Sequence, residues 1–319
     1  MWAATIVDGR VEVRDRPDPE PGTGELLVAV RAAGLNGADM VQVRGGYPAP
    51  PGSPPDILGL ELAGEVLAVG PSVTRFRAGD RVMAVVGGGA QAERCVVHER
   101  VAMPVPDGVS WPEAGGFPEA FITAHDALRS QCGLAMGERV LVHGAAGGVG
   151  TAAVQVAAAA GADVTATVRS PELRDAVAAL AEPGRVHAIA PEGFEQHGPF
   201  DVVLELVGAP NMEENLAALA TGGRVAVIGV GAGADAEVNL LALMARRARI
   251  HGSTLRARPL EEKAIATRRV EAELLPLLAD GRMLVPVAAT FPLADVVAAH
   301  ERFTAGGKLG KIVLVTGDG

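Results

Sequence analysis

Three glycines in the middle of the chain could bind the pyrophosphate of a dinucleotide. Gly144, Gly147 and Gly150 lie in the stretch 139–170, which reads as strand, turn, helix and second strand. Glycines at this spacing allow a sharp turn, let backbone N–H groups approach phosphates, and let the next helix pack closely on the sheet. The helix N-terminus adds unpaired N–H groups and a partial positive charge. Glycines can also serve a tight turn alone, but the apolar strand before them and the Ala/Val-rich segment 151–160 favour dinucleotide binding.

The end of the second strand indicates which dinucleotide binds. The strand ends in Val168-Arg169-Ser170, so no Asp or Glu is present there to accept a hydrogen bond from a ribose 2′-hydroxyl. The guanidinium of Arg169 matches the oxygens of a 2′-phosphate, although an arginine after a strand is often only a solvated charge. The sequence therefore predicts NADPH as the cofactor.

Composition limits the classes of protein to consider. The chain has 319 residues, enough for two domains, and with 49% hydrophobic and 21% charged residues it is globular. A net charge of −10 argues against a nucleic-acid surface. Cys95 and Cys132 are too few for a disulfide framework or a four-cysteine zinc lobe, which fits a reducing cytosol. Charged and apolar residues alternate at 10–14, which predicts a strand and no signal peptide. The uncharged run 140–162 is long enough for a membrane span, but a strand, a turn and a helix explain it better.

Strand and helix patterns change along the chain. The first third holds short strand-like runs punctuated by Gly and Pro, which suggest a small, mainly antiparallel barrel. These runs are Glu25–Arg31, Gly64–Val69, Arg81–Val86 and Arg94–His98. From Glu138 onward apolar strands alternate with helical segments, which predicts a six-stranded doubly wound sheet. The six strands centre near Val140, Val164, His187, Val202, Val225 and Ile250.

The predicted architecture is thus an α/β chain of two domains. A helical stretch at 112–129 carries the chain from barrel to sheet, and we expect the boundary near Phe117. Residues 118–255 form the dinucleotide-binding domain, and 1–117 with 256–319 form the other. After Thr254 the apolar spacing predicts a long helix over 260–278. The strands that follow, Val285–Val287 and Lys311–Val315, need a partner sheet, which the first domain offers.

Nearly end to end, the chain resembles the zinc-free quinone oxidoreductases of the medium-chain dehydrogenase/reductase superfamily. The resemblance rests on AAGLNGADMVQVRGGYP (32–48), ILGLELAGEV (57–66), GFPEAFITAHDAL (116–128), the GAAGGVG turn, STLRAR (253–258) and LGKIVLV (309–315). RGGYPAPPG and PEAFITA make it most similar to the tumour-suppressor-inducible quinone oxidoreductase branch. This resemblance implies a GroES-like barrel plus a Rossmann domain, and a homodimer that pairs the outer Rossmann strand near Ile250.

The resemblance also implies that the chain uses no metal. Zinc-dependent relatives place a ligating Cys in the segment that is GLNGAD here and a ligating His in the segment that is LGLELAG, where this chain has Asn36 and Leu60. A catalytic zinc needs three protein ligands, and a leucine cannot supply one. Glu61 beside Leu60 is then expected to be a structural hydrogen-bond acceptor.

Without a Lewis acid, the reduction of a simple ketone would leave a developing alkoxide poorly stabilised. A quinone or an enone spreads the charge of the hydride by conjugation, so the protein mainly has to position C4 of the nicotinamide and exclude water. We therefore expect an NADPH-dependent reductase of quinones or other electron-poor conjugated alkenes and carbonyls. Two alternatives stay open: an enoyl reductase acting on acyl thioesters, against which the free-standing start and end of the chain weigh, and a non-catalytic NADPH-binding protein of crystallin or sensor type.

The resemblance places two polar residues in the substrate cleft. Tyr47, the sole tyrosine, falls in the family's substrate-facing loop, where its phenol could orient the acceptor or donate a proton. The prolines that follow also suit a tyrosine that simply closes a loop. Asn36 replaces a metal ligand by position, although an Asn before Gly37 commonly forms a turn.

The remaining predicted contacts are to the cofactor, and those from Val207 onward in the chain are implied by the resemblance. Lys311 could otherwise be an ordinary strand-edge charge, and the glycines near 229 could serve only a turn. His143 more plausibly meets packing or backbone needs, and Cys95 is expected to be an inert core thiol. The full predicted set is Gly144, Ala146, Gly147, Gly148, Val149, Gly150, Arg169, Ser170, Val207, Gly229, Val230, Leu255, Arg256, Gly310 and Lys311.

Overall fold

The chain forms two compact units in a computed structural model that describes residues 1–317. The first unit contains residues Met1–Glu119, Leu255–Gly307 and the segment from Lys311 onward. The second contains Ala120–Thr254 and the short segment Lys308–Gly310. The chain therefore passes from one unit to the other several times.

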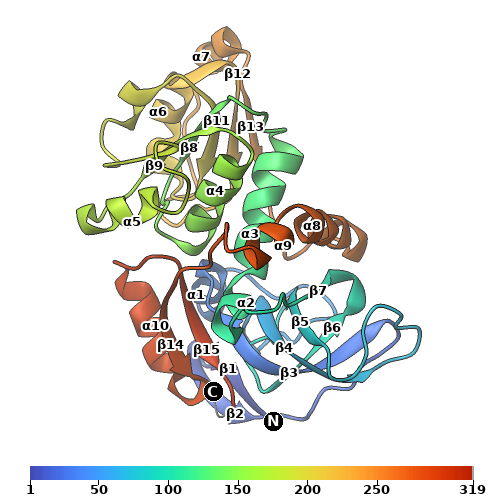
Figure 1. Ribbon diagram of the computed structural model, residues 1–319. Helices are drawn as coiled ribbons and strands as arrows, with labels where there is room; N and C mark the ends of the chain where they lie inside the picture. The colour runs from blue at the N-terminus through green and yellow to red at the C-terminus, as the bar shows by residue number, and fades with distance from the viewer. Residues whose placement is uncertain (318–319) are drawn as a thin grey trace. The chain divides into compact units, whose positions relative to one another are not determined.

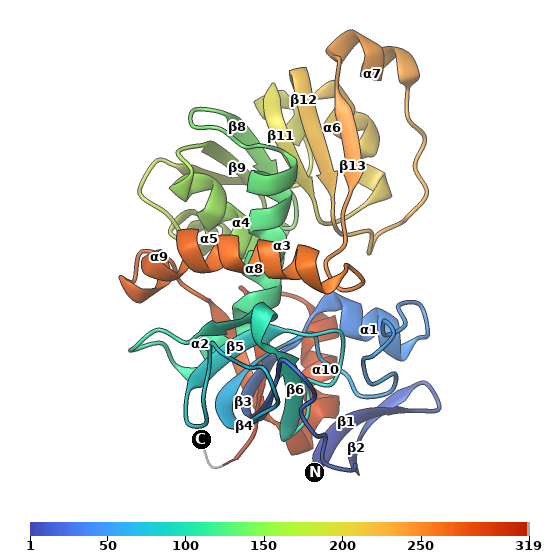
Figure 2. The same cartoon turned by 90° about the vertical axis from the view of Figure 1, so that its right-hand side faces the viewer.

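The second unit is built on a parallel sheet in the order β10-β9-β8-β11-β12-β13. Renumbered within the sheet this order is 3-2-1-4-5-6, the doubly wound order in which cofactors bind where the strand order reverses. Figures 1 and 2 show the sheet. The predicted six-stranded Rossmann fold is confirmed. The strands are β8 Arg139–Val142, β9 Asp163–Thr167, β10 Val186–Ile189, β11 Phe200–Glu205, β12 Leu219–Val227 and β13 Arg249–Gly252.

Helices pack against this sheet and close its core. Because the inner strands β8, β9 and β11 are mostly buried, they consist largely of apolar residues, as in Val202–Leu204. One buried cluster joins Leu141, Phe200 and Val225 of three strands to Leu216 of α6. The helices are α3 Pro118–His125, continued by a π-helical turn at Asp126–Gln131, then α4 Gly148–Ala159, α5 Arg174–Ala178, α6 Met212–Ala217 and α7 Leu240–Arg246.

The first unit is built on a sheet in the order β14-β15-β3-β4-β5-β7, with β6 also paired to β3. All of these pairs are antiparallel except β14 with β15, as expected of a GroES-like domain. The strands are β3 Glu25–Gly34, β4 Glu61–Val69, β5 Arg81–Val85, β6 Arg94–His98, β7 Ala102–Pro104, β14 Val287–Pro292 and β15 Lys311–Val315, with β1 Trp2–Val7 and β2 Arg10–Asp15 forming a separate hairpin.

Two predictions for the first unit, one of a helix and one of a strand, differ from the structure. The helix expected over 260–278 is two helices, because Pro276 lacks the N–H that a continuous helix would use. The strand expected at Val285–Val287 begins only at Val287, since Pro286 cannot donate to the sheet. The helices are α1 Gly37–Val43, α2 Trp111–Gly116, α8 Leu260–Glu273, α9 Leu275–Ala279 and α10 Val296–Ala305.

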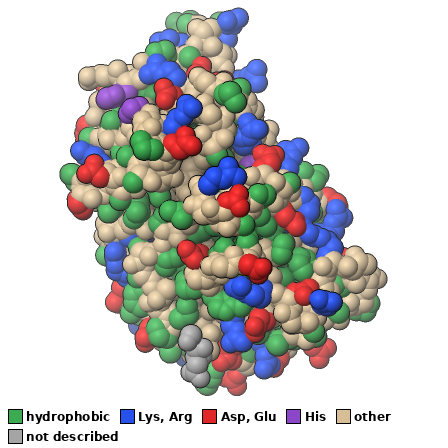
Figure 3. All heavy atoms as spheres, viewed as in Figure 1, with side chains coloured by type: hydrophobic (Ala, Val, Ile, Leu, Met, Phe, Trp, Pro, Cys, Tyr) green, Lys and Arg blue, Asp and Glu red, His purple; other side chains and the backbone are tan. Residues whose placement is uncertain are grey.

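The charges on the surface and the apolar character of the helices were compared with what a membrane protein needs. On the face shown in Figure 3, acidic and basic side chains are interspersed. Within residues 1–317, no helix combines the length and the apolar character that a membrane crossing requires.

Candidate functional site

The glycine turn after β8 has the backbone geometry of a phosphate cradle. Gly144 has a φ of +59°, a conformation that disfavours side chains. A Cβ at Gly150 would lie 2.4 Å from the carbonyl oxygen of Gly144, so α4 can pack this closely only with glycine there. Gly147 is the N-cap of α4 and brings no side chain to its first turn. Among residues 1–317, no N-cap side chain accepts a hydrogen bond from the N–H groups of that turn. These N–H groups are therefore suited to bind an anion.

One predicted cofactor residue from the end of the chain joins this turn. The N–H of Gly310 donates to the carbonyl of Ala146 at 2.8 Å, and Gly310 forms a bridge with Gly147. The structure thus brings Gly310 to Ala146 and Gly147, although more than 150 residues separate them in sequence.

Other predicted cofactor residues lie at the carboxyl ends of strands in the same sheet. Arg169 is exposed just after β9, and Ser170 follows it. Val207 and its neighbour Gly208 donate their N–H groups to Oε1 of buried Glu205, at 2.7 and 2.8 Å. These strand ends share the edge at which cofactors bind in doubly wound sheets.

Gly229 and Val230, which follow β12, differ in how far they are exposed for contact with a ligand. A Cβ at Gly229 would lie 2.5 Å from the carbonyl oxygen of Leu206, so packing within the unit already explains this glycine. Val230 is 48% exposed and available for contact.

His143 belongs to a buried polar network beneath the turn. Its Nδ1 lies 3.2 Å from Oγ1 of Thr167, and its Nε2 lies 2.8 Å from Oδ1 of Asn215. Asn215 in turn donates to Glu205 at 2.7 Å. Burial lowers the pKa of His143, which favours the neutral imidazole. The network ties β8 to β11 and positions the turn.

In the first unit, Lys311 holds a buried cluster together. Its Nζ donates to Oδ1 of Asn36 and to the carbonyl of Leu35, both at 2.8 Å, and lies 2.6 Å from Oε1 of Glu61. Glu61 also accepts from Nδ2 of Asn36 at 3.0 Å and from the N–H of Glu119 at 2.8 Å. β15 lies between β14 and β3, so Lys311 is no edge charge. Its predicted contact with the cofactor stays a prediction.

Asp39 extends this cluster. It is fully buried and accepts from the N–H of Asn36 at 2.8 Å and from Nε2 of Gln91 at 3.1 Å. Burial raises its pKa to about 6, opposed by the backbone N–H of Asn36 and the charge of Lys311. The spacing of Asn36 and Asp39 is that of a capping box, a signal that could have drawn attention to Asp39 in the sequence.

Arg256 fixes the loop that carries Tyr47. Its Nε donates to the carbonyl of Gly87 at 2.8 Å, Nη1 to the carbonyl of Tyr47 at 2.9 Å and Nη2 to Oε1 of Gln42 at 2.7 Å. Its guanidinium carbon also lies 5.0 Å from the centre of the Tyr47 ring. Arg256 is buried, and this arrangement joins it to Tyr47, while its predicted contact with the cofactor stays a prediction. The neighbouring Leu255 is buried as well.

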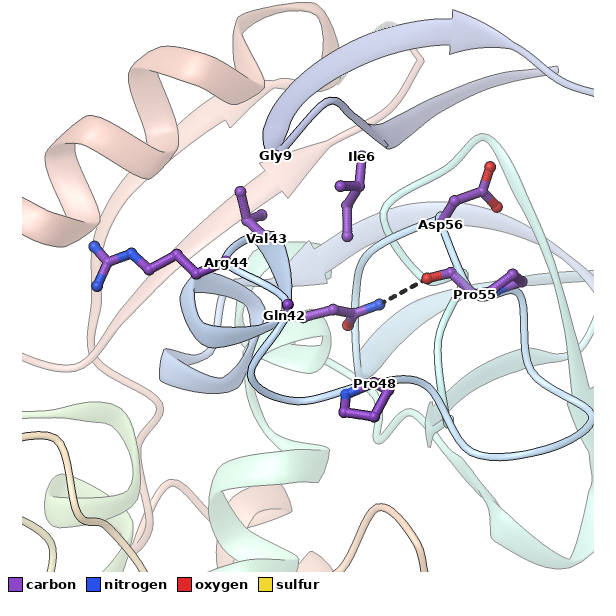
Figure 4. A pocket seen from close by; sticks show the side chains of 9 residues that line it. Ile6, Gly9, Gln42, Val43, Arg44, Pro48, Pro55 and Asp56 are labelled. Atoms are coloured by element: carbon purple, nitrogen blue, oxygen red, sulfur yellow. Dashed lines mark hydrogen bonds between the residues drawn. The ribbon is translucent and has the colours of Figure 1, made fainter. Parts of the chain in front are cut away.

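Gln42 holds the other end of the same loop. Its Nε2 donates to the carbonyl of Pro55 at 3.2 Å, the dashed line in Figure 4. A cavity of about 530 Å³ lies beside the loop. The close-up labels residues that line it, among them Ile6, Val43, Pro48 and Asp56. The loop 47–56 is thus anchored at both ends by Arg256 and Gln42.

Glu119 is a titratable residue that the sequence analysis did not select. It lies in the first turn of α3, partly buried. Burial raises its pKa to about 8, reinforced by the charges of Glu61 and Asp39 and opposed by those of Lys311 and Arg256. Burial, and then the charge of Glu119, raise the pKa of Tyr47. A carboxyl within PEAFITA, immediately after Pro118, was the available signal.

Comparisons with known proteins establish the family. Residues 22–128 match the alcohol dehydrogenase GroES-like domain, and residues 184–314 match the zinc-binding dehydrogenase family. The acryloyl-coenzyme A reductase of Metallosphaera sedula is 32% identical over 98% of this chain and 99% of its own length. The chain belongs to the medium-chain dehydrogenase/reductase superfamily. It is an oxidoreductase of this superfamily, whose members bind a nicotinamide dinucleotide.

The relatives within the superfamily include quinone oxidoreductases and a polyketide synthase. A quinone oxidoreductase of Pseudomonas aeruginosa is 35% identical over 96% of this chain and 95% of its own length. The structure of a quinone oxidoreductase of Pseudomonas syringae pv. tomato matches with a TM-score of 0.86 at 30% identity, over 99% of this chain and all of that one. The polyketide synthase GfsB of Streptomyces halstedii is 34% identical over 91% of this chain, which spans only 5% of that relative's length.

The residues of the first unit do not fit a catalytic zinc ion. Asn36 and Leu60 replace the expected ligands, and Glu61 is bound by the ammonium of Lys311. A second cation beside that ammonium would be repelled, and an amide and a leucine do not complete a zinc ligand set. Within residues 1–317, no three His, Cys, Asp or Glu side chains are grouped as metal ligands.

Proposed function

We propose that the protein is an NADPH-dependent reductase that reduces quinones or other electron-poor conjugated alkenes and carbonyls without a metal. The observation that carries this proposal is the buried Lys311–Glu61–Asn36 cluster, in which Asn36 stands where the resemblance places a metal ligand and the ammonium of Lys311 bonds to Asn36 and Glu61. A protein without a Lewis acid is best suited to acceptors whose conjugation stabilises the charge that the hydride brings.

The second unit supplies the residues that would hold NADPH. The first turn of α4 and the glycine turn would bind the pyrophosphate, and Arg169 would pair with the 2′-phosphate. When bound, NADPH supplies a hydride from C4 of its nicotinamide. Tyr47, whose loop is fixed by Arg256, would orient the acceptor.

Turnover with a panel of acceptors tests the proposal. Purified protein should oxidise NADPH faster than NADH with quinones and enones, and a chelator should leave the rate unchanged. Activity that depends on added zinc, or on simple alcohols and ketones alone, would contradict the proposal. The metal content of the purified protein provides an independent check.

A second candidate is an enoyl reductase that acts on acyl thioesters. The end-to-end similarity to an acryloyl-coenzyme A reductase favours it. An acryloyl or crotonyl thioester offered beside a quinone separates the two, because the natural acceptor class should show the higher kcat/KM. NADPH binding without oxidation by any acceptor would instead indicate a non-catalytic NADPH-binding protein.

We also propose that the protein forms a homodimer through the outer strand of its sheet. β13 is the last strand in the order, and Figure 2 shows it at the edge beside β12. On nearby α7, Leu240, Leu241 and Met244 are among the most exposed apolar side chains, which suits a covered surface. Replacement of Leu241 by Glu should lower the mass measured by light scattering from dimer to monomer. The two free, buried cysteines fit a reducing cytosol as its location.

A further inference from the structure

A chain of buried polar side chains runs from the glycine turn to Glu205 in the second unit. The N–H of Gly144 donates to Oγ1 of Thr167 at 3.3 Å, and that oxygen lies 3.2 Å from Nδ1 of His143. Nε2 of His143 lies 2.8 Å from Oδ1 of Asn215, whose Nδ2 donates to Oε2 of Glu205 at 2.7 Å. All four side chains are buried, so the hydrogen bonds of this chain are shielded from water.

Glu205, at one end of the chain, acts only as an acceptor. Its Oε1 accepts from the N–H groups of Val207 and Gly208, at 2.7 and 2.8 Å. Its two oxygens also accept from Nδ2 of Asn211, and Oε2 accepts from Nδ2 of Asn215. Because these partners are all N–H donors, the carboxyl behaves as a carboxylate does. Asn215 must therefore turn its NH₂ group towards Glu205 and its carbonyl oxygen away from it.

The tautomer of His143 follows from the position of that carbonyl oxygen. Oδ1 of Asn215 can only accept, so Nε2 of His143 carries the hydrogen that it receives. Burial lowers the pKa of His143 against the charge of Glu205, so the imidazole is neutral and its Nδ1 carries no hydrogen. Nδ1 then accepts from the hydroxyl of Thr167, whose oxygen accepts from Gly144 in turn. Every donor in the chain thus points from the glycine turn towards Glu205.

Glu205 serves two neighbouring turns at once. Its Oε1 holds the N–H groups of Val207 and Gly208 after β11, and its Oε2 reaches Gly144 after β8 through the chain. A Cβ at Gly144 would lie 3.6 Å from Cγ2 of Val207, so the two turns are close neighbours. A displaced carboxylate would therefore disturb both turns at the edge of the sheet where cofactors bind.

The chain also determines which N–H groups are left for phosphates. Gly144 donates to Oγ1 of Thr167, Ala145 donates to the carbonyl of Thr167 at 3.1 Å, and Gly147 donates to the carbonyl of Gly144 at 3.0 Å. These three N–H groups are engaged within the unit, so the first turn of α4, from Gly148 onward, is left to bind phosphates. The position of that turn depends on the loop before it, which the chain holds at Gly144.

We propose that Glu205 is a positioning residue for the dinucleotide. It sets the direction of the hydrogen-bond chain through Asn215, His143 and Thr167, and thereby fixes the glycine turn beside the turn that follows β11. Glu205 acts through the groups that it holds and needs no contact of its own with the cofactor. This assignment rests on the proposed binding of NADPH at the glycine turn.

Nitrogen NMR of His143 tests the direction of the chain without any cofactor. In the wild type near neutral pH, the imidazole should carry its hydrogen on Nε2 alone. Glu205→Gln presents an NH₂ group to Asn215, whose amide should turn over to accept from it, and the hydrogen of His143 should then move to Nδ1. A wild type with a hydrogen on Nδ1 overturns the assignment, and so does an unchanged tautomer in Glu205→Gln. Glu213→Gln, which removes an exposed carboxylate from α6, is the control and should leave the tautomer unchanged.

Cofactor binding by Thr167→Val tests the effect on the turn and leaves Glu205 in place. Valine has the shape of threonine without its hydroxyl, so the N–H of Gly144 loses its acceptor. The Kd values for NADPH and NADH should both rise by about 5- to 50-fold. Their ratio should be unchanged, because both dinucleotides contain the pyrophosphate. The kcat at saturating NADPH should stay within about threefold of wild type, and Thr167→Ser, which keeps the hydroxyl, should bind as the wild type does.

A matched control separates positioning from general packing. Thr165→Val removes a buried hydroxyl from the same strand, two residues earlier, and should leave both dissociation constants unchanged. Equal binding by wild type and Thr167→Val, or an equal loss in Thr165→Val, overturns the positioning role while the reductase function stands. A wild type that binds neither NADPH nor NADH overturns the proposed function and this role with it.

Discussion

The Nζ atom of Lys311 lies 2.6 Å from Oε1 of Glu61, and the two side chains are 4% and 0% exposed. This pair joins the start of β15 to the start of β4, on either side of β3 in the sheet order. Asn36 contacts both members, accepting from the lysine and donating to the carboxylate. The pair is therefore fully hydrogen-bonded, as a buried charge must be to be tolerated.

Removal of one member of this pair should be strongly destabilising. We expect Lys311→Met to lower the free energy of unfolding by about 3–5 kcal/mol, because the carboxylate of Glu61 is left buried without a cation. Urea denaturation measures the change. Addition of Glu61→Gln to the variant should recover part of the loss. Arg282→Met is the control: its pair with Asp280 is 65% and 62% exposed and should contribute less than about 1 kcal/mol.

Substitutions at two glycines of the turn should separate binding from folding. A Cβ at Gly147 would lie 3.4 Å from the carbonyl oxygen of Gly144, so Gly147→Ala should fold but weaken NADPH binding by more than about tenfold. A Cβ at Gly150 would come within 2.4 Å of the same oxygen. Gly150→Ala should therefore lose about 1–3 kcal/mol of stability as well. Fluorescence titration with NADPH and thermal denaturation distinguish the two effects.

Arg169 should determine the choice between NADPH and NADH. Arg169→Ala should reduce the preference for NADPH by about ten- to a hundredfold, because loss of a charge-assisted contact costs about 1.5–3 kcal/mol. The ratio of the two dissociation constants measures it. Arg185→Ala removes another exposed charge just before β10, at the opposite end of the strands, and should not change the ratio. An unaltered ratio in Arg169→Ala would show that another group selects the cofactor. Arg174, whose Nε donates to the carbonyl of Val168 at 3.2 Å, would then be the residue to test.

His300 should make the protein less stable in acid. Burial lowers its pKa to about 4 from 6.5, and its Nε2 is buried with no partner among residues 1–317. The unfolded chain therefore binds a proton between pH 6.5 and 4 that the folded chain does not. The contribution of His300 to stability is complete above pH 6.5 and is lost as the pH falls through this window, by roughly 3 kcal/mol.

His300→Leu should flatten the stability curve between these pH values. Denaturation midpoints measured at several pH values provide the check, with His187→Leu as a control because His187 is exposed. Equal acid sensitivity in wild type and His300→Leu would mean that other groups account for the loss.

Local patterns in the sequence predicted the elements of the fold well. The six predicted strands of the second unit appear as β8 to β13, and the inner strands β8, β9 and β11 show the apolar runs that strands buried on both sides need. The breaks at Pro276 and Pro286 were visible in the sequence, but the apolar spacing outweighed them in the prediction. A proline that lacks an N–H decides the boundary even where the hydrophobic pattern continues.

The site was predicted less completely because its contacts are long-range. The resemblance implied a cofactor contact for Gly310, and its hydrogen bond to Ala146 in the turn was not predicted. The partners of Lys311 and Arg256 lie more than 150 residues away in the sequence, so no local pattern could reveal that both are buried and hydrogen-bonded. Glu119 acquires its character only from carboxyls that the fold brings near it.

The hydrogen bond between Gly310 and Ala146 has a consequence for how the protein is made. Residues 308–310 belong to the second unit, yet the ribosome adds them only after residues 255–307 of the first unit. The nascent second unit therefore lacks the residue that hydrogen-bonds to Ala146 throughout that interval. The surroundings of the glycine turn are thus completed only at a late stage of translation, when most of the first unit has also been synthesised.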